Sequence, residues 1–252
     1  MCGMQVQEGV PALGSRERFR KVILATVGFN YSRPWRAVAS IGLEPGSLVI
    51  IVNSEPRTRE AVDAVEKLKN MIIDAYGDLH VETRDVWLDP SNGIPRGVAK
   101  MRRVVEEAAP ASAYILASGG LRWLVVSALL TAMALQTVGV FRGIKVEMLR
   151  VDLESEAEGI DLNIRPEMLQ PLQLESVPPL ATIDYKELLV VETLAGLGRA
   201  RVKSIARSLQ VSRTLADRLL RKLESKKLIS SEVRGRGKLY SLTDLGYMLV
   251  GI

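Results

Sequence analysis

Two short loops carry the groups best suited to hold a small anionic ligand. One covers residues 28–32 and the other residues 118–122, each directly after an apolar run. Glycine lets the backbone approach a phosphate closely, free N–H groups at the start of a helix favour an anion, and an arginine adds a fixed charge. The candidate ligand-binding residues are Gly28, Phe29, Asn30, Ser32, Ser54, Ser118, Gly119, Gly120, Leu121 and Arg122.

Neither loop contains a known nucleotide fingerprint. The first apolar run is not followed by G-x-G-x-x-G, and G-x-x-x-x-G-K-[ST] occurs nowhere in the sequence. NAD binding and P-loop chemistry are therefore poorly supported. Each loop taken alone is also compatible with simple turn glycines after a strand. Two such loops at one edge of a predicted sheet favour ligand binding.

Residues suited to catalysis are scarce. The only histidine, His80, lies at the start of the third predicted strand, away from both loops, where a surface or packed role is expected. The only cysteine, Cys2, lies in the N-terminal lead-in, and a single cysteine allows no intrachain disulfide. The acidic run over 152–161 is expected to be a solvated connection rather than a cation site. We therefore expect no catalytic residue, no metal and no cofactor, in a chain that works in the cytoplasm.

Apolar β-branched runs alternate with helical patterns in the first two thirds of the chain. We expect strands over 21–27, 47–52, 79–86, 113–117 and 144–151, a candidate sixth over 159–164, and helices over 34–41, 56–75, 95–109 and 121–137. This alternation predicts a Rossmann-like, doubly wound and mostly parallel sheet. In the common strand order the first and fourth strands are neighbours, so the two loops meet where ligands bind.

Proline and hydrophobicity patterns set the expected domain boundaries. Four prolines interrupt regular structure between residues 166 and 179. We expect a disordered lead-in over 1–20, a ligand-sensing and dimerisation domain over 21–165, a proline-rich linker over 166–182 and a DNA-binding domain over 183–252. The most hydrophobic stretch, Trp123 to Leu135, is too short for a membrane span and predicts a buried helix. Its excess hydrophobicity also predicts a contribution to a homodimer interface.

The last seventy residues have the pattern of a winged helix-turn-helix, a small α+β fold. From Ala181 onward there are 14 Lys and Arg against 7 Asp and Glu, whereas the rest of the chain has 20 against 22. Three predicted helices, the third capped by Ser212, precede a basic hairpin over 228–242. Such a helix suits the major groove, and a basic hairpin tip reaches phosphates. The expected DNA contacts are Lys203, Ser212, Arg213, Thr214, Arg218, Arg221, Lys222, Arg234, Arg236 and Lys238. The alternatives are a helical domain with a solvated basic face and a winged helix used for protein contacts.

The segments ATVGFNYS, GSLVIIVNSEPRTREAVDAV and ILASGGLRWLVV, followed by this C-terminal pattern, resemble the archaeal CRISPR-associated transcription regulators. Those proteins join a CRISPR-associated Rossmann-fold sensor domain to a winged helix, and the resemblance spans Lys21 to Leu249. It implies a homodimer that binds double-stranded DNA and holds a cyclic oligoadenylate, cyclic tetra-adenylate, at the two loops. It also implies regulation of CRISPR arrays and associated genes. The pair Pro34-Trp35 departs from the pattern, and its bulky ring predicts a narrowed pocket.

Two alternatives to simple sensing remain open at this point. In one, the sensor domain also cleaves the cyclic oligoadenylate, with Ser118 and Arg122 as the candidates and Arg122 stabilising the charge that develops on phosphorus. In the other, the protein is a one-component regulator that responds to a different small anionic metabolite.

Overall fold

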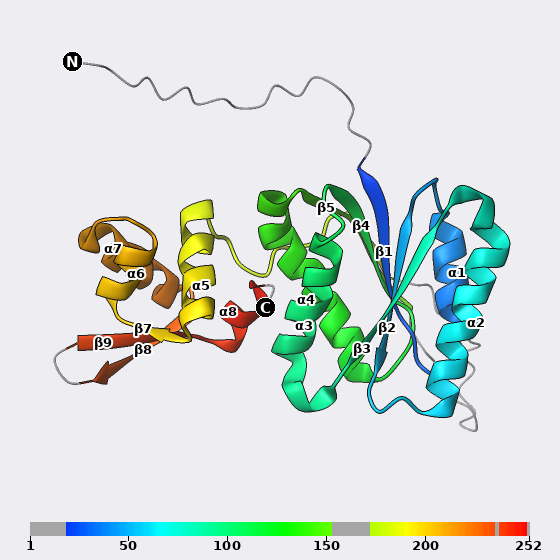
Figure 1. The fold of residues 1–252 in the computed structure, drawn as a ribbon, viewed down its shortest axis with the longest axis horizontal. Coiled ribbons are helices and arrows are strands. Elements are labelled where there is room, and N and C mark those ends of the chain that lie inside the picture. Colours follow the sequence, from blue (N-terminus) through cyan, green and yellow to red (C-terminus); the bar gives the residue numbers. More distant parts are fainter. Residues whose placement is uncertain (1–18, 153–171, 235–236, 251–252) are drawn as a thin grey trace, which may run out of the picture.

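A computed structural model describes residues 19–152, 172–234 and 237–250. Cys2, Arg236, the candidate sixth strand over 159–164 and the acidic run after Asp152 lie outside these ranges, as does most of the expected lead-in. The described residues form two modules, which share one interface (Figure 1).

A six-stranded sheet forms the N-terminal module. Its strands are β1 (Arg20–Thr26), β2 (Leu48–Ser54), β3 (Glu82–Leu88), β4 (Ala111–Ala117), β5 (Ile144–Val151) and β6 (Leu172–Leu174). They lie in the order β3-β2-β1-β4-β5-β6, and all pairs are parallel except β5 with β6. The connecting helices are α1 (Ser32–Ile41), α2 (Arg59–Tyr76), α3 (Gly93–Glu106) and α4 (Arg122–Val138), with short turns η1 (Gly77–Leu79), η2 (Pro90–Asn92) and η3 (Gly139–Arg142). This is the predicted Rossmann-like architecture.

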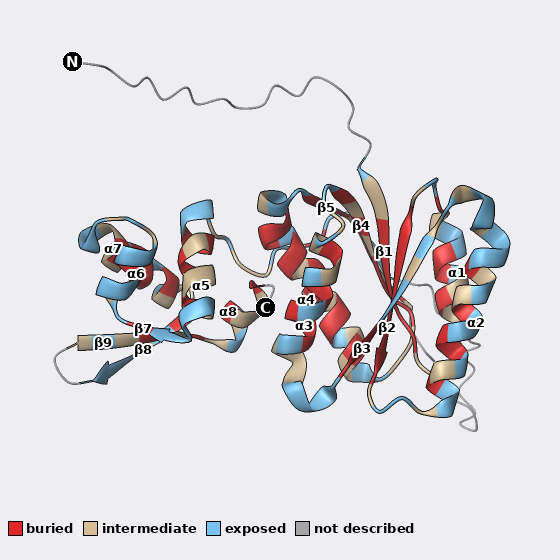
Figure 2. Cartoon of the chain, in the orientation of Figure 1, coloured by how far each residue is buried: buried red, intermediate tan, exposed pale blue. Residues whose placement is uncertain are grey.

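Both faces of the sheet are covered, which explains the continuous hydrophobicity of its central strands. In β1, Val22 and Leu24 belong to the core shared with α3 and α4, whereas Ile23 and Ala25 belong to the core shared with α1 and α2. Buried residues accordingly fill the sheet and the helix faces turned toward it (Figure 2). A strand that alternates between two cores has no side for polar residues.

The segment expected to be a linker over 166–182 is not free of the first module. It contains β6, which was not predicted and which pairs antiparallel with β5. Val177 is buried in the core beneath α3 and α4, and the backbone N–H of Leu180 donates to the carbonyl of Met133. The described part of this segment, residues 172–182, contains no helix, but its apolar side chains still pack on the sheet domain.

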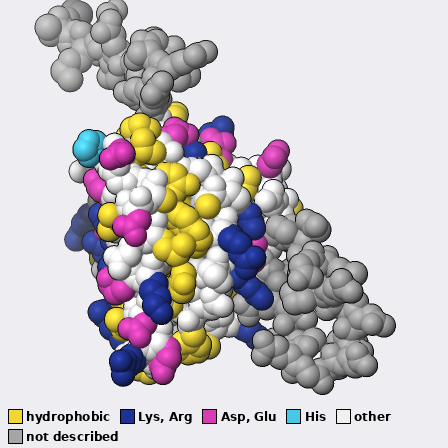
Figure 3. All heavy atoms as spheres, turned by 90° about the vertical axis from the view of Figure 1, so that its right-hand side faces the viewer, with side chains coloured by type: hydrophobic (Ala, Val, Ile, Leu, Met, Phe, Trp, Pro, Cys, Tyr) yellow, Lys and Arg dark blue, Asp and Glu magenta, His cyan; other side chains and the backbone are white. Residues whose placement is uncertain are grey.

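The third strand begins later than predicted. Residues 77–79 form η1, and β3 starts at Glu82 rather than at Leu79. His80 therefore lies in the turn before β3, with a left-handed φ of 51°. Its imidazole is found at one edge of the molecule in Figure 3, which views the face covered by α1 and α2. A residue that precedes β3 lies at the amino ends of the strands, opposite the end where the loops meet.

The C-terminal module combines helices with a three-stranded antiparallel sheet ordered β7-β9-β8. Its elements are α5 (Tyr185–Leu197), β7 (Arg199–Ala200), α6 (Val202–Ser208), α7 (Arg213–Ser225), β8 (Ile229–Arg234), β9 (Gly237–Leu242) and α8 (Asp244–Met248). Three helices, a hairpin and a short closing helix thus follow in the predicted order, with β7 as an additional strand. Ser212 caps α7 as expected, because its hydroxyl accepts from the N–H of Leu215.

The apolar helix α4 lies between the sheet and the C-terminal module (Figure 1). With η3 it forms the one helical stretch among the described residues, Arg122–Arg142, that is long and apolar enough to cross a membrane. This stretch extends beyond the apolar run from Trp123 to Leu135, so length alone does not exclude a membrane span, whereas the buried helix predicted for the run is present as α4. More than half of it is buried inside the molecule, and Ala134 and Val138 share a core with the C-terminal module. This second contact accounts for hydrophobicity beyond what one sheet-covering face requires.

Candidate ligand-binding site and nucleic-acid interface

The two predicted loops meet at the carboxyl ends of β1 and β4, which pair directly. A Cβ on Gly28 would lie 2.8 Å from both the Cα and the N of Gly120, so no side chain fits there. Gly120 has a φ of +98°, and a Cβ on it would lie 3.0 Å from Leu124 and from the carbonyl of Val27. Only glycine at both positions allows this close backbone approach. The predicted switch point is confirmed.

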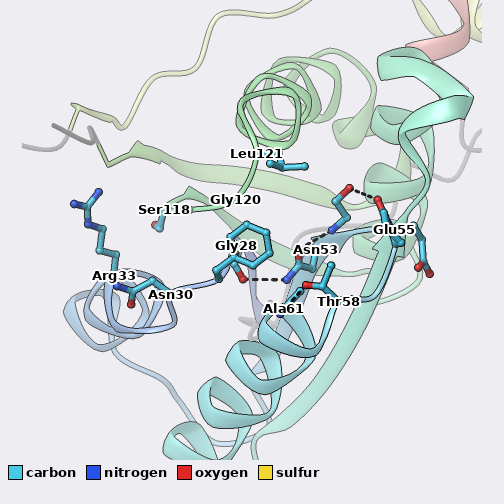
Figure 4. A pocket seen from close by; sticks show the side chains of 14 residues that line it. Gly28, Asn30, Arg33, Asn53, Glu55, Thr58, Ala61, Ser118, Gly120 and Leu121 are labelled. Atoms are coloured by element: carbon cyan, nitrogen blue, oxygen red, sulfur yellow. Dashed lines mark hydrogen bonds between the residues drawn. The ribbon is translucent and has the colours of Figure 1, made fainter. Parts of the chain in front are cut away.

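A cavity of about 310 Å³ opens between these loops, the end of β2 and the start of α2 (Figure 4). Eight of the ten predicted ligand-binding residues line it: Gly28, Phe29, Asn30, Ser54, Ser118, Gly119, Gly120 and Leu121. Ser32 instead lines a neighbouring cavity, and its hydroxyl donates to Asn30 Oδ1. Arg122 is the exposed first residue of α4 and does not line the cavity. Ser32 and Arg122 are the first residues of α1 and α4, each beyond the end of the loop that lines the cavity.

Outside the two loops, Ser54 is the one lining residue that was predicted from the sequence. The additional lining residues are Arg33, Asn53, Glu55, Pro56, Thr58 and Ala61. Asn53 is buried, donates to the carbonyl of Gly28 over 3.2 Å and accepts from the N–H of Ser54 over 2.7 Å. It thereby ties the end of β2 to the first loop (Figure 4). An asparagine that ends an apolar strand run was the signal available in the sequence, because a buried amide needs specific partners.

Ser118 is the polar side chain that most directly indicates a ligand. It is 1% exposed, it lines the cavity, and its Oγ has no hydrogen-bond partner among the described residues. A buried hydroxyl without a partner costs about 1–3 kcal/mol, so natural proteins satisfy such groups by a ligand or by water. The start of α4 follows immediately, and its N-cap residue Leu121 offers no side-chain cap to the helix. Hydroxyl and helix start together form a place for an anion.

Charge and an aromatic ring complete the cavity. Arg33 and Glu55 are its charged lining residues, and Glu55 is paired with Arg57 over 3.1 Å. Arg57 in turn lies over the ring of Trp87 at 5.0 Å. Phe29 is 63% exposed at the cavity, so its ring face is open to stacking by a planar group. The cavity therefore combines the buried hydroxyl of Ser118 and the start of α4 with an exposed aromatic ring.

Trp35 does not narrow this cavity, and that expectation was wrong. The ring packs at the edge of the core beneath α1 and α2, 6.2 Å from the ring of Tyr76. The neighbouring Pro34 is buried, and its Cγ would lie 3.6 Å from a Cβ on Gly119. Because α1 begins before Pro34, helical geometry turns Trp35 toward α2 and away from the loops.

The polar and basic side chains predicted to face DNA gather on α6, α7 and the β8–β9 hairpin. All nine that the structure describes are exposed: Lys203, Ser212, Arg213, Thr214, Arg218, Arg221, Lys222, Arg234 and Lys238. Arg221 is held by Asp217 one turn earlier on α7, at 2.7 Å. Lys238 lies 3.5 Å from Glu224, so part of the hairpin charge is balanced within the module.

Lys222 has a different environment from its neighbours. Its ammonium lies 3.2 Å from Glu187 and 3.3 Å from Asp184, and these carboxylates raise the pKa of Lys222. Glu187 is fully buried and also binds Lys226 at 2.7 Å. Lys222 thus fastens α7 to α5, which the sequence alone did not reveal because its partners lie more than thirty residues earlier in the chain.

Comparison with known proteins identifies the N-terminal module. Residues 21–160 match the family described as the Csa3 CRISPR-associated Rossmann-like domain. No curated protein matches the chain.

Proposed function

The chain belongs to the family of the Csa3 CRISPR-associated Rossmann-like domain, and on that premise we propose that it is a ligand-responsive transcription regulator of CRISPR-associated genes or arrays. In this proposal the N-terminal module is a sensor that binds a cyclic oligoadenylate, with cyclic tetra-adenylate as the first candidate. The C-terminal module is a winged helix-turn-helix that binds duplex DNA. The protein acts in the cytoplasm by binding and releasing these partners, without catalysis and without a cofactor.

The observation that carries the sensor role is the unpartnered hydroxyl of Ser118 inside the switch-point cavity. A phosphate oxygen accepts from this hydroxyl and from the first N–H groups of α4. Arg33 supplies positive charge to the same cavity, and the exposed ring of Phe29 is placed to stack on an adenine. A phosphate next to a planar base is the repeating unit of an oligoadenylate.

The size of the cavity supports a ligand shared between two protomers. A volume of about 310 Å³ is at the lower limit of pockets that hold one drug-sized molecule, which is too small for a ring of four nucleotides. Cyclic tetra-adenylate has internal two-fold symmetry, so a two-fold dimer presents the same loops to both halves of it. Phe29 and Leu121, which line the cavity and are 63% and 47% exposed, become covered in such an arrangement, as does Val126, which is 44% exposed on α4.

We therefore predict a homodimer in solution. Light scattering at micromolar protein concentration, without ligand or DNA, is expected to give twice the mass of the 27.7 kDa chain. A Phe29→Ser/Val126→Ser double variant, which changes exposed apolar side chains only, is expected to shift the mass toward the monomer. A monomeric wild-type protein contradicts the shared site.

The DNA-binding role rests on the surface of the C-terminal module. Its exposed cations lie on the helix that follows the α6–α7 turn and on the hairpin, the two places where this fold contacts the major groove and phosphates. Arg213 and Arg218 have no ion pair within the described residues, so both remain available to bases or phosphates. The excess of seven positive charges after residue 180 supports the same role.

Calorimetry with cyclic tetra-adenylate tests the sensor. Ser118→Ala removes one hydrogen bond to a charged group in each protomer, so affinity is expected to fall by about 1.5–3 kcal/mol per site. The fold is expected to become no less stable, because a buried unsatisfied hydroxyl disappears. Ser32→Ala, in the neighbouring cavity, is the matched control and keeps wild-type affinity.

Three outcomes distinguish the alternatives in that experiment. Equal affinity of Ser118→Ala and wild type places the ligand elsewhere. Linear products found by chromatography after incubation support cleavage of the ring. Absence of binding by the wild type supports a sensor for another small anionic metabolite.

A further inference from the structure

Helix α4 connects the switch-point cavity to the C-terminal module. Its N-cap residue Leu121 lines the cavity, and Leu124, in its first turn, is the side chain that would meet a Cβ on Gly120. Ala134 and Val138, in the last turns of the same helix, share one core with α5 and α8. A single 17-residue helix therefore touches both proposed binding units.

The chain that enters the C-terminal module is fastened to the last turns of α4. Thr137 Oγ1 accepts from the N–H of Leu180 over 2.8 Å and from the N–H of Ala181 over 3.3 Å. The same hydroxyl donates to the carbonyl of Met133 over 2.9 Å, which fixes its orientation. A displacement of this end of α4 consequently moves the start of the C-terminal module as well.

A cluster of four charged side chains fixes the same junction from the other side. Arg102 and Glu106 of α3 are 3.0 Å apart, and Arg142 of η3 pairs with Glu192 of α5. Arg102 also donates to the carbonyl of Met248 in α8 over 3.5 Å. Burial lowers the pKa of Arg102 and raises the pKa of Glu106, as expected where charges are removed from water. The modules are thus joined by a packed core and by directional contacts.

We infer that α4 transmits occupancy of the cavity to the C-terminal module, with the Arg142–Glu192 pair holding that module to the moving end. This inference rests on the proposed function. A ligand that displaces Gly120 or Leu121 shifts the first turn of α4, and a close-packed helix responds as one body. The orientation of α5 and α8, and with it that of α7, then differs between the two states.

Hydrogen exchange tests this inference without ligand or DNA. Gly120→Ala places a Cβ 3.0 Å from Leu124 and so presses on the first turn of α4. Amide exchange is expected to accelerate about 2- to 30-fold at residues 130–141 and 185–195, far from the substitution. Gly46→Ala is the matched control, because Gly46 also has a positive φ but has open space around it and lies away from α4. Changes confined to residues 118–124 overturn the inference.

A second pair of variants serves if Gly120→Ala does not fold. Arg142→Ala breaks an ion pair between the modules, whereas Arg84→Ala breaks a similar pair, with Glu107, inside the N-terminal module. The two arginine side chains are 45% and 46% exposed, so neither change threatens the core. Two affinities are expected to stay within about twofold of the wild-type values in both variants. One is the affinity for cyclic tetra-adenylate in the absence of DNA, and the other is the affinity for a duplex selected with the wild type, in the absence of ligand.

The readout is the ligand-caused change in affinity for that duplex. In Arg142→Ala the logarithm of this affinity ratio, with ligand over without, is expected to fall by at least half. In Arg84→Ala the ratio is expected to equal that of the wild type. An unchanged ligand effect in Arg142→Ala overturns the inference. If the wild type does not bind the ligand, the proposed ligand is wrong, and hydrogen exchange in Gly120→Ala decides the transmission by itself. If that variant is unfolded, faster exchange at residues 118–124 in Arg142→Ala supports the transmission, and changes confined to the neighbours of Arg142 and Glu192 overturn it.

Discussion

Ser118 and Arg102 show two different reasons for burying a polar side chain. Ser118 lies in the cavity with an unpartnered hydroxyl, a group that is stable there only when something else supplies its hydrogen bond. Arg102 lies at the module junction, 1% exposed, with Glu106 as its partner. The Ser118 hydroxyl can take a ligand as its hydrogen-bond partner, whereas the charge of Arg102 is already paired with Glu106 inside the protein. Burial alone does not distinguish them, but the presence of a partner does.

The junction pair makes a prediction about stability. Glu106→Ala leaves the buried charge of Arg102 without its nearest partner, and we expect the free energy of unfolding to fall by about 3 kcal/mol. Glu107→Ala, one position later, removes a carboxylate that is 48% exposed and is expected to cost less than about 1 kcal/mol. Urea denaturation of the two variants measures both values. Equal effects would show that the pair does not stabilise the junction.

Helix α7 combines fastening and exposed residues within one element. Lys222 forms ion pairs with Asp184, the N-cap residue of α5, and with Glu187 in the first turn of α5. Arg218, one turn earlier on α7, is exposed and has no ion pair within the described residues. Apolar residues at helical spacing form the inner face of α7, where Leu219 and Leu223 are buried and Leu215 is half-buried. The sequence did not show which cations of α7 pair with α5 and which remain exposed. That separation requires the position of α5.

Substitutions on α7 and on the hairpin are expected to act differently on DNA binding. Arg218→Ala should weaken binding to a selected duplex by about 1–3 kcal/mol and relax base preference, since this exposed arginine lies on the proposed recognition helix. Lys238→Ala should weaken binding to all duplexes alike. It should also reduce the slope of the logarithm of affinity against the logarithm of salt concentration by about 1. Lys222→Ala is the control on the same helix, with little effect because its ammonium is already paired.

Fluorescence anisotropy with selected and random duplexes, over a series of salt concentrations, measures these effects. A loss of affinity in Lys222→Ala equal to that in Arg218→Ala would contradict the assignment of tasks on α7. Equal affinity of the wild type for selected and random duplexes would contradict sequence-specific binding.

Elements and the site were predictable from sequence to different degrees. Long apolar runs with a clear period located the strands, the helices and the meeting of Gly28 with Gly120. The three-residue strand β6 carries no period, and it was missed because its pairing depends on β5. Asn53 and Arg33 were missed because their contribution depends on how β2 and α1 are placed around the two loops, which the loop residues alone do not reveal.

At the scale of the whole molecule, the two modules form one packed unit. Val98, Ala134 and Val138 of the N-terminal module share a core with Leu188 and Leu194 of the C-terminal module. Hydrogen bonds to Thr137 and the charge cluster at the junction add directional contacts. A module attached in this way has a defined orientation, so under the proposed function a change at the cavity is able to alter how two copies meet one duplex.

The central claim is that one chain links a ligand in the switch-point cavity to a DNA duplex on α7 and the hairpin. The most direct test is the affinity of wild-type protein for its selected duplex, measured by anisotropy with and without saturating cyclic tetra-adenylate. We predict that the dissociation constant changes by about 5- to 150-fold, the usual range for coupled sites. The change should be absent in Ser118→Ala at a ligand concentration that saturates only the wild type. An identical dissociation constant with and without bound ligand would contradict the account.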